Sequence, residues 1–141
     1  MSIEKILVVD DDELSRAYLS EALQRDGYSV DNACDGQEAV GLTDKQNYDM
    51  IFLDMRMPRM GGMKVLERVK KTSKETTVVI MTAYGSIESA VEAMQKGAYD
   101  YIIKPFSVDN IELLLKRVQE RQKLIDENKY WRSKLDSNVE N

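Results

Sequence analysis

The sequence predicts an α/β fold in which one parallel sheet of five strands is covered by helices on both faces. Five short strand-like segments alternate with five segments of helical periodicity along the 141 residues, and this alternation is typical of βαβ units. Three of the strand-like segments contain no polar residue, as expected for strands that are buried on both faces. Because crossovers between parallel strands are right-handed, we expect a doubly wound sheet.

The composition of the strands predicts their order. Residues 6–9, 50–53 and 78–81 are entirely apolar and are predicted to be central. Residues 28–33 alternate between polar and apolar side chains, and residues 99–103 are mixed, so both are predicted to be edge strands. The predicted order is therefore 2-1-3-4-5, with the strands numbered along the chain.

Helical periodicity fills the intervals between these strands. Apolar side chains at helical spacing predict helices over residues 13–25 and 37–45, and a third helix that contains residues 63–69. Ser86 and Ser107 precede the last two periodic segments and are predicted to cap those helices.

The composition is that of one globular domain with little additional chain. It is 43% hydrophobic and 32% charged, so a core can be buried. The single cysteine excludes an internal disulfide, and no apolar run is long enough to span a membrane. We therefore expect a cytoplasmic protein with no membrane partner.

Charge and the absence of histidine exclude further function classes. The sequence contains no histidine, which excludes histidine metal ligands and histidine general bases. The net charge is −5, and residues 107–141 hold seven acidic and seven basic side chains, so the first 106 residues carry the whole excess. Since there is no basic patch, we expect no direct binding of nucleic acid by this chain.

Four of the five predicted strands end at charged or hydroxyl-bearing residues. The first ends at Asp10, Asp11 and Asp12, the third at Asp54, the fourth at Thr82 and the fifth at Lys104. The carboxyl ends of parallel strands meet at one edge of the sheet, where the sites of doubly wound folds form. Each residue alone has a structural alternative, such as a helix cap, a turn residue or a solvated strand end. Their combination at these strand ends favours a functional site.

The residue types at that edge indicate phosphoryl chemistry. Carboxylate oxygens without histidine or thiolate neighbours suit a hard cation such as Mg²⁺. A carboxylate can accept a phosphoryl group as an acyl phosphate, and the protein must then neutralise the charge on the phosphoryl oxygens. Lys104 and the metal ion would supply positive charge, and the Thr82 hydroxyl would supply a hydrogen-bond donor. A bound cation also explains why carboxylates are crowded there.

Residues 1–120 contain four motifs in a characteristic order: "ILVVDDD", "IFLDMRMP…GG", "VIMTAYG" and "YIIKPF". With these motifs the segment resembles the receiver domain of bacterial two-component response regulators. The resemblance implies a flavodoxin-like (βα)5 receiver. It implies that Asp54 accepts a phosphoryl group from a sensor histidine kinase and that Thr82 and Lys104 hold the phosphoryl oxygens. It also implies that the chain is a switch that assists its own phosphorylation and dephosphorylation and is not an enzyme.

The same resemblance implies a set of metal ligands. Mg²⁺ would be bound directly by Asp11 and mainly through water by Asp10, in a cluster that includes Asp54. The backbone carbonyl of Arg56 would be a further ligand.

The resemblance also implies a switch and a backbone geometry. Tyr101 would be the aromatic switch residue that moves inward as Thr82 shifts; the structural alternative is an aromatic side chain that packs an edge strand on the last helix. The Lys104–Pro105 peptide bond would be cis.

A longer stretch, "MTAYGSIESAVEAMQKGAYDYIIKPF", resembles the receivers of sigma-54-dependent transcription activators of the nitrogen-regulatory-protein-C family. In that family an ATPase domain and a DNA-binding domain follow the receiver. The phosphate-loop motif of the ATPase is absent from these residues. We therefore expect either a fragment of a longer activator or a stand-alone regulator.

The last helix is predicted to extend beyond the receiver. Sequence without glycine or proline continues through residues 121–141, and we assign this segment to a linker or dimerisation helix. An apolar stripe supports a homodimer, with Leu124 and Trp131 in a neighbouring stripe. Its members are Ile111, Leu114, Val118, Ile125 and Leu135. The alternative is a charged tail in solvent.

Two other functions are compatible with the residues alone. A Mg²⁺-dependent phosphatase with an aspartyl nucleophile would need a second carboxylate two residues after Asp54, where this chain has Arg56. A receiver-like interaction module that is never phosphorylated would not need the complete set of site residues.

Overall fold

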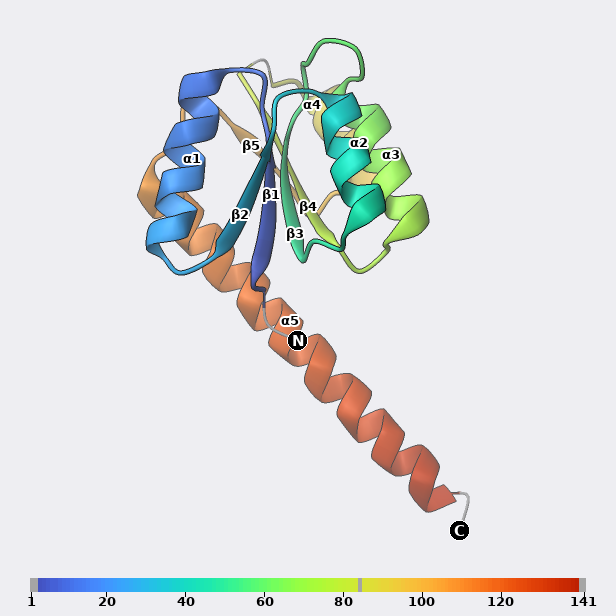
Figure 1. Ribbon diagram of the computed structural model, residues 1–141. Helices are drawn as coiled ribbons and strands as arrows, with labels where there is room; N and C mark the ends of the chain where they lie inside the picture. The colour runs from blue at the N-terminus through green and yellow to red at the C-terminus, as the bar shows by residue number, and fades with distance from the viewer. Residues whose placement is uncertain (1–2, 84, 140–141) are drawn as a thin grey trace.

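The computed structural model describes residues 3–83 and 85–139 and has the predicted doubly wound architecture (Figure 1). All strand pairs are parallel and the order is β2-β1-β3-β4-β5. The strands are β1 Lys5–Val9, β2 Ser29–Ala33, β3 Met50–Asp54, β4 Thr77–Thr82 and β5 Asp100–Ile103. The helices are α1 Glu13–Arg25, α2 Gly36–Lys45, α3 Gly62–Thr72, α4 Ile87–Gln95 and α5 Val108–Val139. The predicted fold class, strand order and extended last helix are confirmed.

Alternation along the central strands divides the core into two layers. Ile6 and Val8 of β1 pack with side chains of α1 and α5. Leu7 and Val9 point to the other face and pack with side chains of α2 and α3. Figure 1 shows the same division, with α1 and α5 on one side of the sheet and α2, α3 and α4 on the other. Strands covered on both faces must be continuously apolar, which explains why these segments stand out in the sequence.

The helix caps and strand edges also agree with the sequence. The side-chain oxygen of Ser86 accepts a hydrogen bond from the Ser89 N–H at 3.1 Å, and Ser107 accepts one from the Asn110 N–H at 3.2 Å. Strands β2 and β5 lie at the edges and are only partly buried, whereas β3 and β4 are fully buried. Within the described part of the chain, none of the helices is long and apolar enough to cross a membrane.

The long helix α5 divides into a part that builds the core and a part that leaves it. Ile111, Leu114 and Val118 are buried against the sheet. These three residues were predicted to belong to a dimer stripe, and the structure assigns them to the chain's own core. Leu124 and Trp131 are 66% and 60% exposed, where Figure 1 shows the helix extending away from the body.

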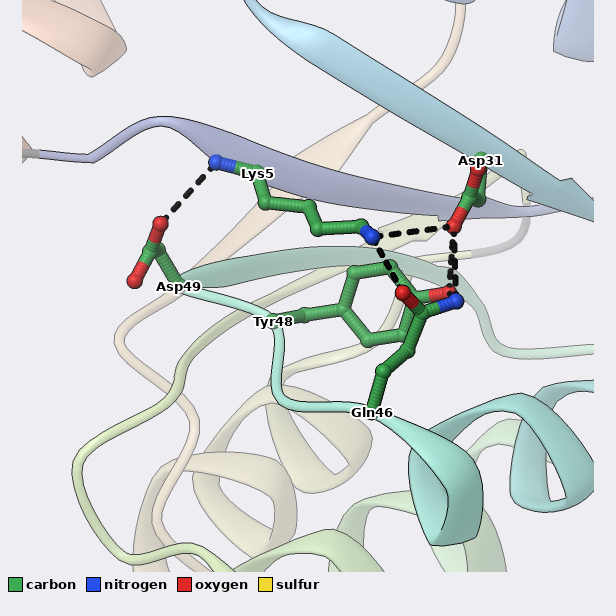
Figure 2. Close-up of polar contacts among 5 residues, drawn as sticks. All are labelled: Lys5, Asp31, Gln46, Tyr48 and Asp49. Atoms are coloured by element: carbon green, nitrogen blue, oxygen red, sulfur yellow. Dashed lines mark hydrogen bonds and ion pairs between the residues drawn. The ribbon is translucent and has the colours of Figure 1, made fainter.

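A polar network fixes the start of the sheet at the end opposite the predicted site (Figure 2). The Tyr48 hydroxyl donates to Asp31 at 2.7 Å, and the Gln46 amide donates to both residues. Burial, and then the bond to Asp31, raise the pKa of Tyr48 well above its usual range, so the hydroxyl stays protonated and donates. Asp49 accepts the Lys5 backbone N–H at 2.9 Å. The network therefore joins β1, β2 and the segment that leads into β3.

Gly62 of α3 and Gly41 of α2 differ in how much space surrounds them. A Cβ atom at Gly62 would collide with the carbonyl oxygen of Asp54 and lie 2.9 Å from the Met55 Cα. The Gly62 N–H also donates to the Met55 carbonyl at 3.0 Å. Gly41, in the middle of α2, has no atom within 4 Å of such a Cβ. Of these two glycines, only Gly62 is needed for close approach, and what it approaches is the end of β3.

We predict that Gly62→Ala and Gly41→Ala change stability in opposite directions. Gly62→Ala should lower the free energy of unfolding by about 1–3 kcal/mol, because backbone atoms must move to admit the methyl group. Gly41→Ala should raise it by about 0.5–1 kcal/mol, because alanine is the better helix residue. Urea unfolding followed by circular dichroism measures both. Equal effects of the two substitutions would show that α3 does not need this close approach.

Candidate functional site

Strand register brings the predicted site residues to one end of the sheet. Val9 pairs with Leu53, so the next residues along the two strands, Asp10 and Asp54, are neighbours. Asp54 pairs with Met81, which places Thr82 one residue beyond it. In Figure 1 this is the end of the sheet where β1 enters α1 and β3 enters the loop before α3.

Lys104 reaches this cluster from the end of β5. Its backbone N–H donates to the Thr82 carbonyl oxygen at 2.8 Å. Its ammonium nitrogen lies 2.6 Å from Asp10 Oδ2 and 3.7 Å from Asp54 Oδ2. The Lys104–Pro105 bond is cis, as predicted. The structure therefore brings together four of the predicted residues, Asp10, Asp54, Thr82 and Lys104.

Carboxylates outnumber cations in this cluster. Oxygen atoms of Asp10, Asp11 and Asp54 lie within 4.8 Å of one another, and Asp10 and Asp54 are buried. Burial is the main cause that raises the pKa of Asp54 to about 7. The Lys104 charge and a backbone hydrogen bond from Arg56 act in the opposite direction, whereas Asp10 raises the pKa further. The buried site therefore resists holding its full negative charge.

The donor atoms fit a hard divalent cation. The cluster offers carboxylate oxygens from three residues on two adjacent strand ends, which is the ligand type that Mg²⁺ prefers. Asp11 is exposed while Asp10 and Asp54 are buried, so one side of the cluster is open to solvent. A cation of charge +2 would favour the ionised form of Asp54 and so oppose both causes of its raised pKa, burial first and then repulsion from Asp10.

The third acidic residue of the run, Asp12, has a separate role. It is the N-cap residue of α1. Its backbone N–H donates to Asp10 Oδ1 at 2.9 Å, and its carboxylate accepts the Ser15 hydroxyl at 2.8 Å. The hydrogen bond from Ser15 is the main cause that lowers the pKa of Asp12. Asp12 therefore occupies the N-cap position of α1, without a side-chain capping hydrogen bond to the helix backbone.

Thr82 and Tyr101 lie on the same face of the sheet. Ile80 pairs with Tyr101, and side chains two residues apart on a strand share a face, so Thr82 follows Ile80 on that face. Thr82 is 1% exposed. Tyr101 packs against the core layer that contains Ile80, and its hydroxyl is buried without a hydrogen-bond partner among the described residues. The tyrosine ring therefore points inward.

Several residues around the site could not be found from the sequence. An Arg16 Nη1 atom donates to the Asp10 carbonyl oxygen at 2.7 Å. Arg59 has a left-handed φ of 69° and donates to Asp35 at 3.0 Å, which ties the loop after β3 to the start of α2. Gly62 belongs to the quoted motif that follows the third strand, but the motif alone does not show that this glycine packs directly behind Asp54. Arginine is common on helices and loops, so only the three-dimensional contact distinguishes these positions.

The arrangement can support attack by the Asp54 carboxylate on a phosphorus atom and can neutralise the charge that results. Arg56, two residues after Asp54, is exposed and carries no carboxylate. The residue that would act as general acid or base in an aspartyl phosphatase is therefore missing at this position.

Comparison with known proteins agrees with this geometry. Residues 6–116 match the family model of the response regulator receiver domain. The chain is 38% identical to the regulatory protein AtoC of Escherichia coli over 123 residues, which are 87% of this chain and 27% of AtoC. It is 37% identical to sporulation initiation phosphotransferase F of Bacillus subtilis, over 83% of this chain and 94% of that protein.

Solved structures give the same result. NtrX from Brucella abortus is 34% identical and has a TM-score of 0.85, over 93% of this chain and 30% of that chain. The chemotaxis protein CheY4 of Vibrio cholerae is 34% identical and has a TM-score of 0.78, over 83% of this chain and 99% of that chain.

The matches to AtoC and NtrX agree with the narrower resemblance drawn from residues 81–106, and the chain spans less than a third of either protein. The family model, the strand order and the position of the acidic cluster lead to one conclusion: this chain belongs to the response regulator receiver domains of two-component systems.

Proposed function

We propose that this receiver is a switch in which Asp54 accepts a phosphoryl group from a sensor histidine kinase. One observation carries the proposal. Lys104 contacts Asp10 and lies 3.7 Å from Asp54, and the oxygens of Asp10, Asp11 and Asp54 lie within 4.8 Å of one another. Asp54 therefore has both a cation and a metal-ligand set beside it.

Mg²⁺ is the metal that the residues fit. Asp10, Asp11 and Asp54 would hold it, with the backbone carbonyl of Arg56 as a further ligand. When bound, the ion would neutralise negative charge on the phosphoryl oxygens.

The protein's own residues would do the remaining work. An oxygen of Asp54 attacks the phosphorus, the bond between phosphorus and the donor breaks, and an acyl phosphate forms. Lys104, whose shortest contact is to Asp10, turns its ammonium group toward the new phosphoryl oxygens. The Thr82 hydroxyl donates to another of these oxygens. Each of the two contacts is stronger once the phosphoryl group is on Asp54, so modification favours a different arrangement of β4 and β5.

Tyr101 is the residue that would relay this change to the surface. Its ring faces the same side of the sheet as Thr82, and its hydroxyl has no partner among the described residues. Large apolar side chains nearby are exposed on α4 and β5, namely Ile87, Val91 and Ile103. Movement of Thr82 and Tyr101 would change how α4 and β5 present these side chains. The switch would thus alter which contacts the receiver makes.

The output proposed for the full-length protein is activation of transcription in the cytoplasm. Support comes from the similarity to AtoC and NtrX, of which the chain spans only the receiver portion. A regulator of that kind would carry an ATPase domain and a DNA-binding domain outside this chain, and those domains would contact nucleic acid.

We further propose that residues 1–120 act as the receiver and residues 121–141 as a linker helix that forms a homodimer. Because Ile111, Leu114 and Val118 are buried in the core, the seam is confined to the exposed residues of the extension. Leu124, Trp131 and Leu135 are spaced by seven and four residues. Their side chains are 66%, 60% and 63% exposed, respectively. Two such helices can pair along this stripe.

Asp54 phosphorylation is the first test. Acetyl phosphate with Mg²⁺ should add one phosphoryl group, which hydroxylamine removes, and Asp54→Asn should abolish the addition. The matched control is Asp12→Asn, which changes an acidic neighbour whose carboxylate accepts the Ser15 hydroxyl and which should still be labelled. Intact mass spectrometry measures the product. Full labelling of Asp54→Asn would place the acceptor elsewhere, repeated turnover would indicate a phosphatase, and no labelling of the unmodified chain would indicate a silent module.

Mg²⁺ should stabilise the folded chain, increasingly so as pH rises. The folded-state pKa of Asp54, about 7 without metal, lies above its ordinary value, so the metal-free protein loses stability as pH rises toward and through 7. Ionised Asp54 binds the ion better. At a Mg²⁺ concentration of a hundred times Kd the gain is about 2.7 kcal/mol. Thermal unfolding at pH 5.5 and pH 8 measures it.

The control for this experiment compares the removal of a carboxylate inside the cluster with the removal of one far from it. Asp11→Ala should erase the gain at pH 8, and Asp44→Ala, which changes an acidic residue paired with Arg68 on the helices, should retain it. An equal gain in both variants would refute the assignment of the metal ligands.

The dimer should depend on one face of the extension. Leu124→Glu should weaken self-association at least tenfold, because an ionised side chain is placed in the seam, whereas Lys123→Glu on the adjacent face should change it little. A chain that ends at Lys129 keeps the 2.8 Å contact with Glu75 but lacks Trp131 and Leu135, and it should be largely monomeric. Sedimentation equilibrium measures all three. Identical masses and concentration dependence would mean that the extension is a solvated tail.

A further inference from the structure

A second group of like charges lies at the end of the sheet opposite Asp54. It surrounds a cavity of about 360 Å³ formed by the end of α3, the loop before β4, the turn before β5 and α5. Four basic side chains line it: Lys70, Lys74, Arg121 and Lys129. Figure 1 shows that α5 leaves the body of the receiver at this end.

The basic side chains of this cavity are poorly neutralised. The Lys70 ammonium group donates to the backbone carbonyls of Lys74, at 3.2 Å, and of Thr76. Burial, and then the nearby Arg121, lower the pKa of Lys70. Among the described residues, Lys70, Lys74 and Arg121 form no ion pair with a carboxylate.

One carboxylate lines the cavity, and it is already engaged. Glu75 lies 2.8 Å from the Lys129 ammonium nitrogen. Lys70, Lys74 and Arg121 thus form a local excess of positive charge in a chain whose net charge is −5. This is the reverse of the Asp54 site, because four basic side chains line the cavity with the single carboxylate of Glu75.

The cavity is also lined by guanidinium and ammonium groups, which can donate hydrogen bonds to the oxygens of an anion. Arg121 contributes a planar guanidinium that stacks over the Tyr99 ring, 5.3 Å from its centroid. A guanidinium fork together with ammonium groups matches the several oxygens of a phosphate group better than a single carboxylate.

We propose that this cavity binds a small oxyanion of the phosphate class, held by Lys70, Lys74 and Arg121. The site is separate from Asp54 and does not depend on the proposed phosphorylation. Because Arg121 lies on α5 whereas Lys70 lies on α3, the bound anion joins the two helices. It thereby holds the start of the 121–141 extension against the receiver body, in addition to the Lys129–Glu75 contact.

The experiment is a titration of the Asp54→Asn chain with inorganic phosphate and with pyrophosphate in EDTA, at constant ionic strength set by sodium chloride. Removal of divalent metal and of the acceptor carboxylate excludes binding at the Asp54 site. Backbone amide NMR shifts report both the position and the affinity. We expect saturable shifts at residues 97–99 and 121–125.

Three variants make the test specific. Arg121→Gln should weaken binding at least tenfold, because a charge-assisted contact is lost. Glu75→Gln should strengthen it, because the carboxylate that competes for the cations is removed. Arg117→Gln is the matched control: it lies one turn earlier on α5, 3.9 Å from Asp100, and should leave the affinity within twofold.

Either of two results would overturn the proposal. One is the absence of saturable shifts around the cavity with both anions. The other is an equal loss of affinity in Arg117→Gln and Arg121→Gln, which would mean that the anion responds to the general charge of α5. Amide spectra of the variants without ligand verify that each remains folded.

Discussion

Negative charge at the carboxyl end of the sheet is the constraint on which the structure depends. β3 is buried along its whole length, so Asp54 emerges where little water can solvate it, next to Asp10 on the adjacent strand. Lys104 alone, 2.6 Å from Asp10 and 3.7 Å from Asp54, cannot neutralise this cluster. Without a further cation, the repulsion between Asp10 and Asp54 is only partly offset. A group attached to Asp54 would lie beside Lys104 and beside the carboxylates that could bind a metal ion. The proposed transfer of a phosphoryl group to Asp54 would relieve part of the same imbalance, because it would bring the metal ion and Lys104 together around the modified residue.

The surrounding fold holds this imbalance in place. Gly62 lets α3 approach the Asp54 backbone, and the Arg16 side chain holds the Asp10 carbonyl. At the other end of the strands, the hydrogen bonds among Asp31, Gln46 and Tyr48 fix where the sheet begins (Figure 2). These contacts hold the backbone of β1 and β3, whose pairing through Val9 and Leu53 keeps Asp10 beside Asp54.

Much of this arrangement could be predicted from the sequence, for a physical reason. Central parallel strands must be apolar on both faces, so their positions and order are visible in the residues, and parallel strands bring Asp10, Asp54, Thr82 and Lys104 to one edge. The stripe on α5 could be detected but not assigned, because periodicity shows that Ile111 and Val118 share a face without showing what covers it. In the structure, the sheet covers them. Contacts of Arg16 and Gly62 likewise depend on distances that residue spacing does not encode.

The central claim is that buried, crowded carboxylates raise the pKa of Asp54 and that a divalent cation lowers it. Carboxyl ¹³C NMR of labelled aspartate, titrated with and without Mg²⁺ and assigned with Asp54→Asn, measures this directly. The account predicts an Asp54 pKa near 7 without the ion and a clearly lower pKa with saturating ion. An Asp54 pKa near 4 that is the same with and without Mg²⁺ would contradict it.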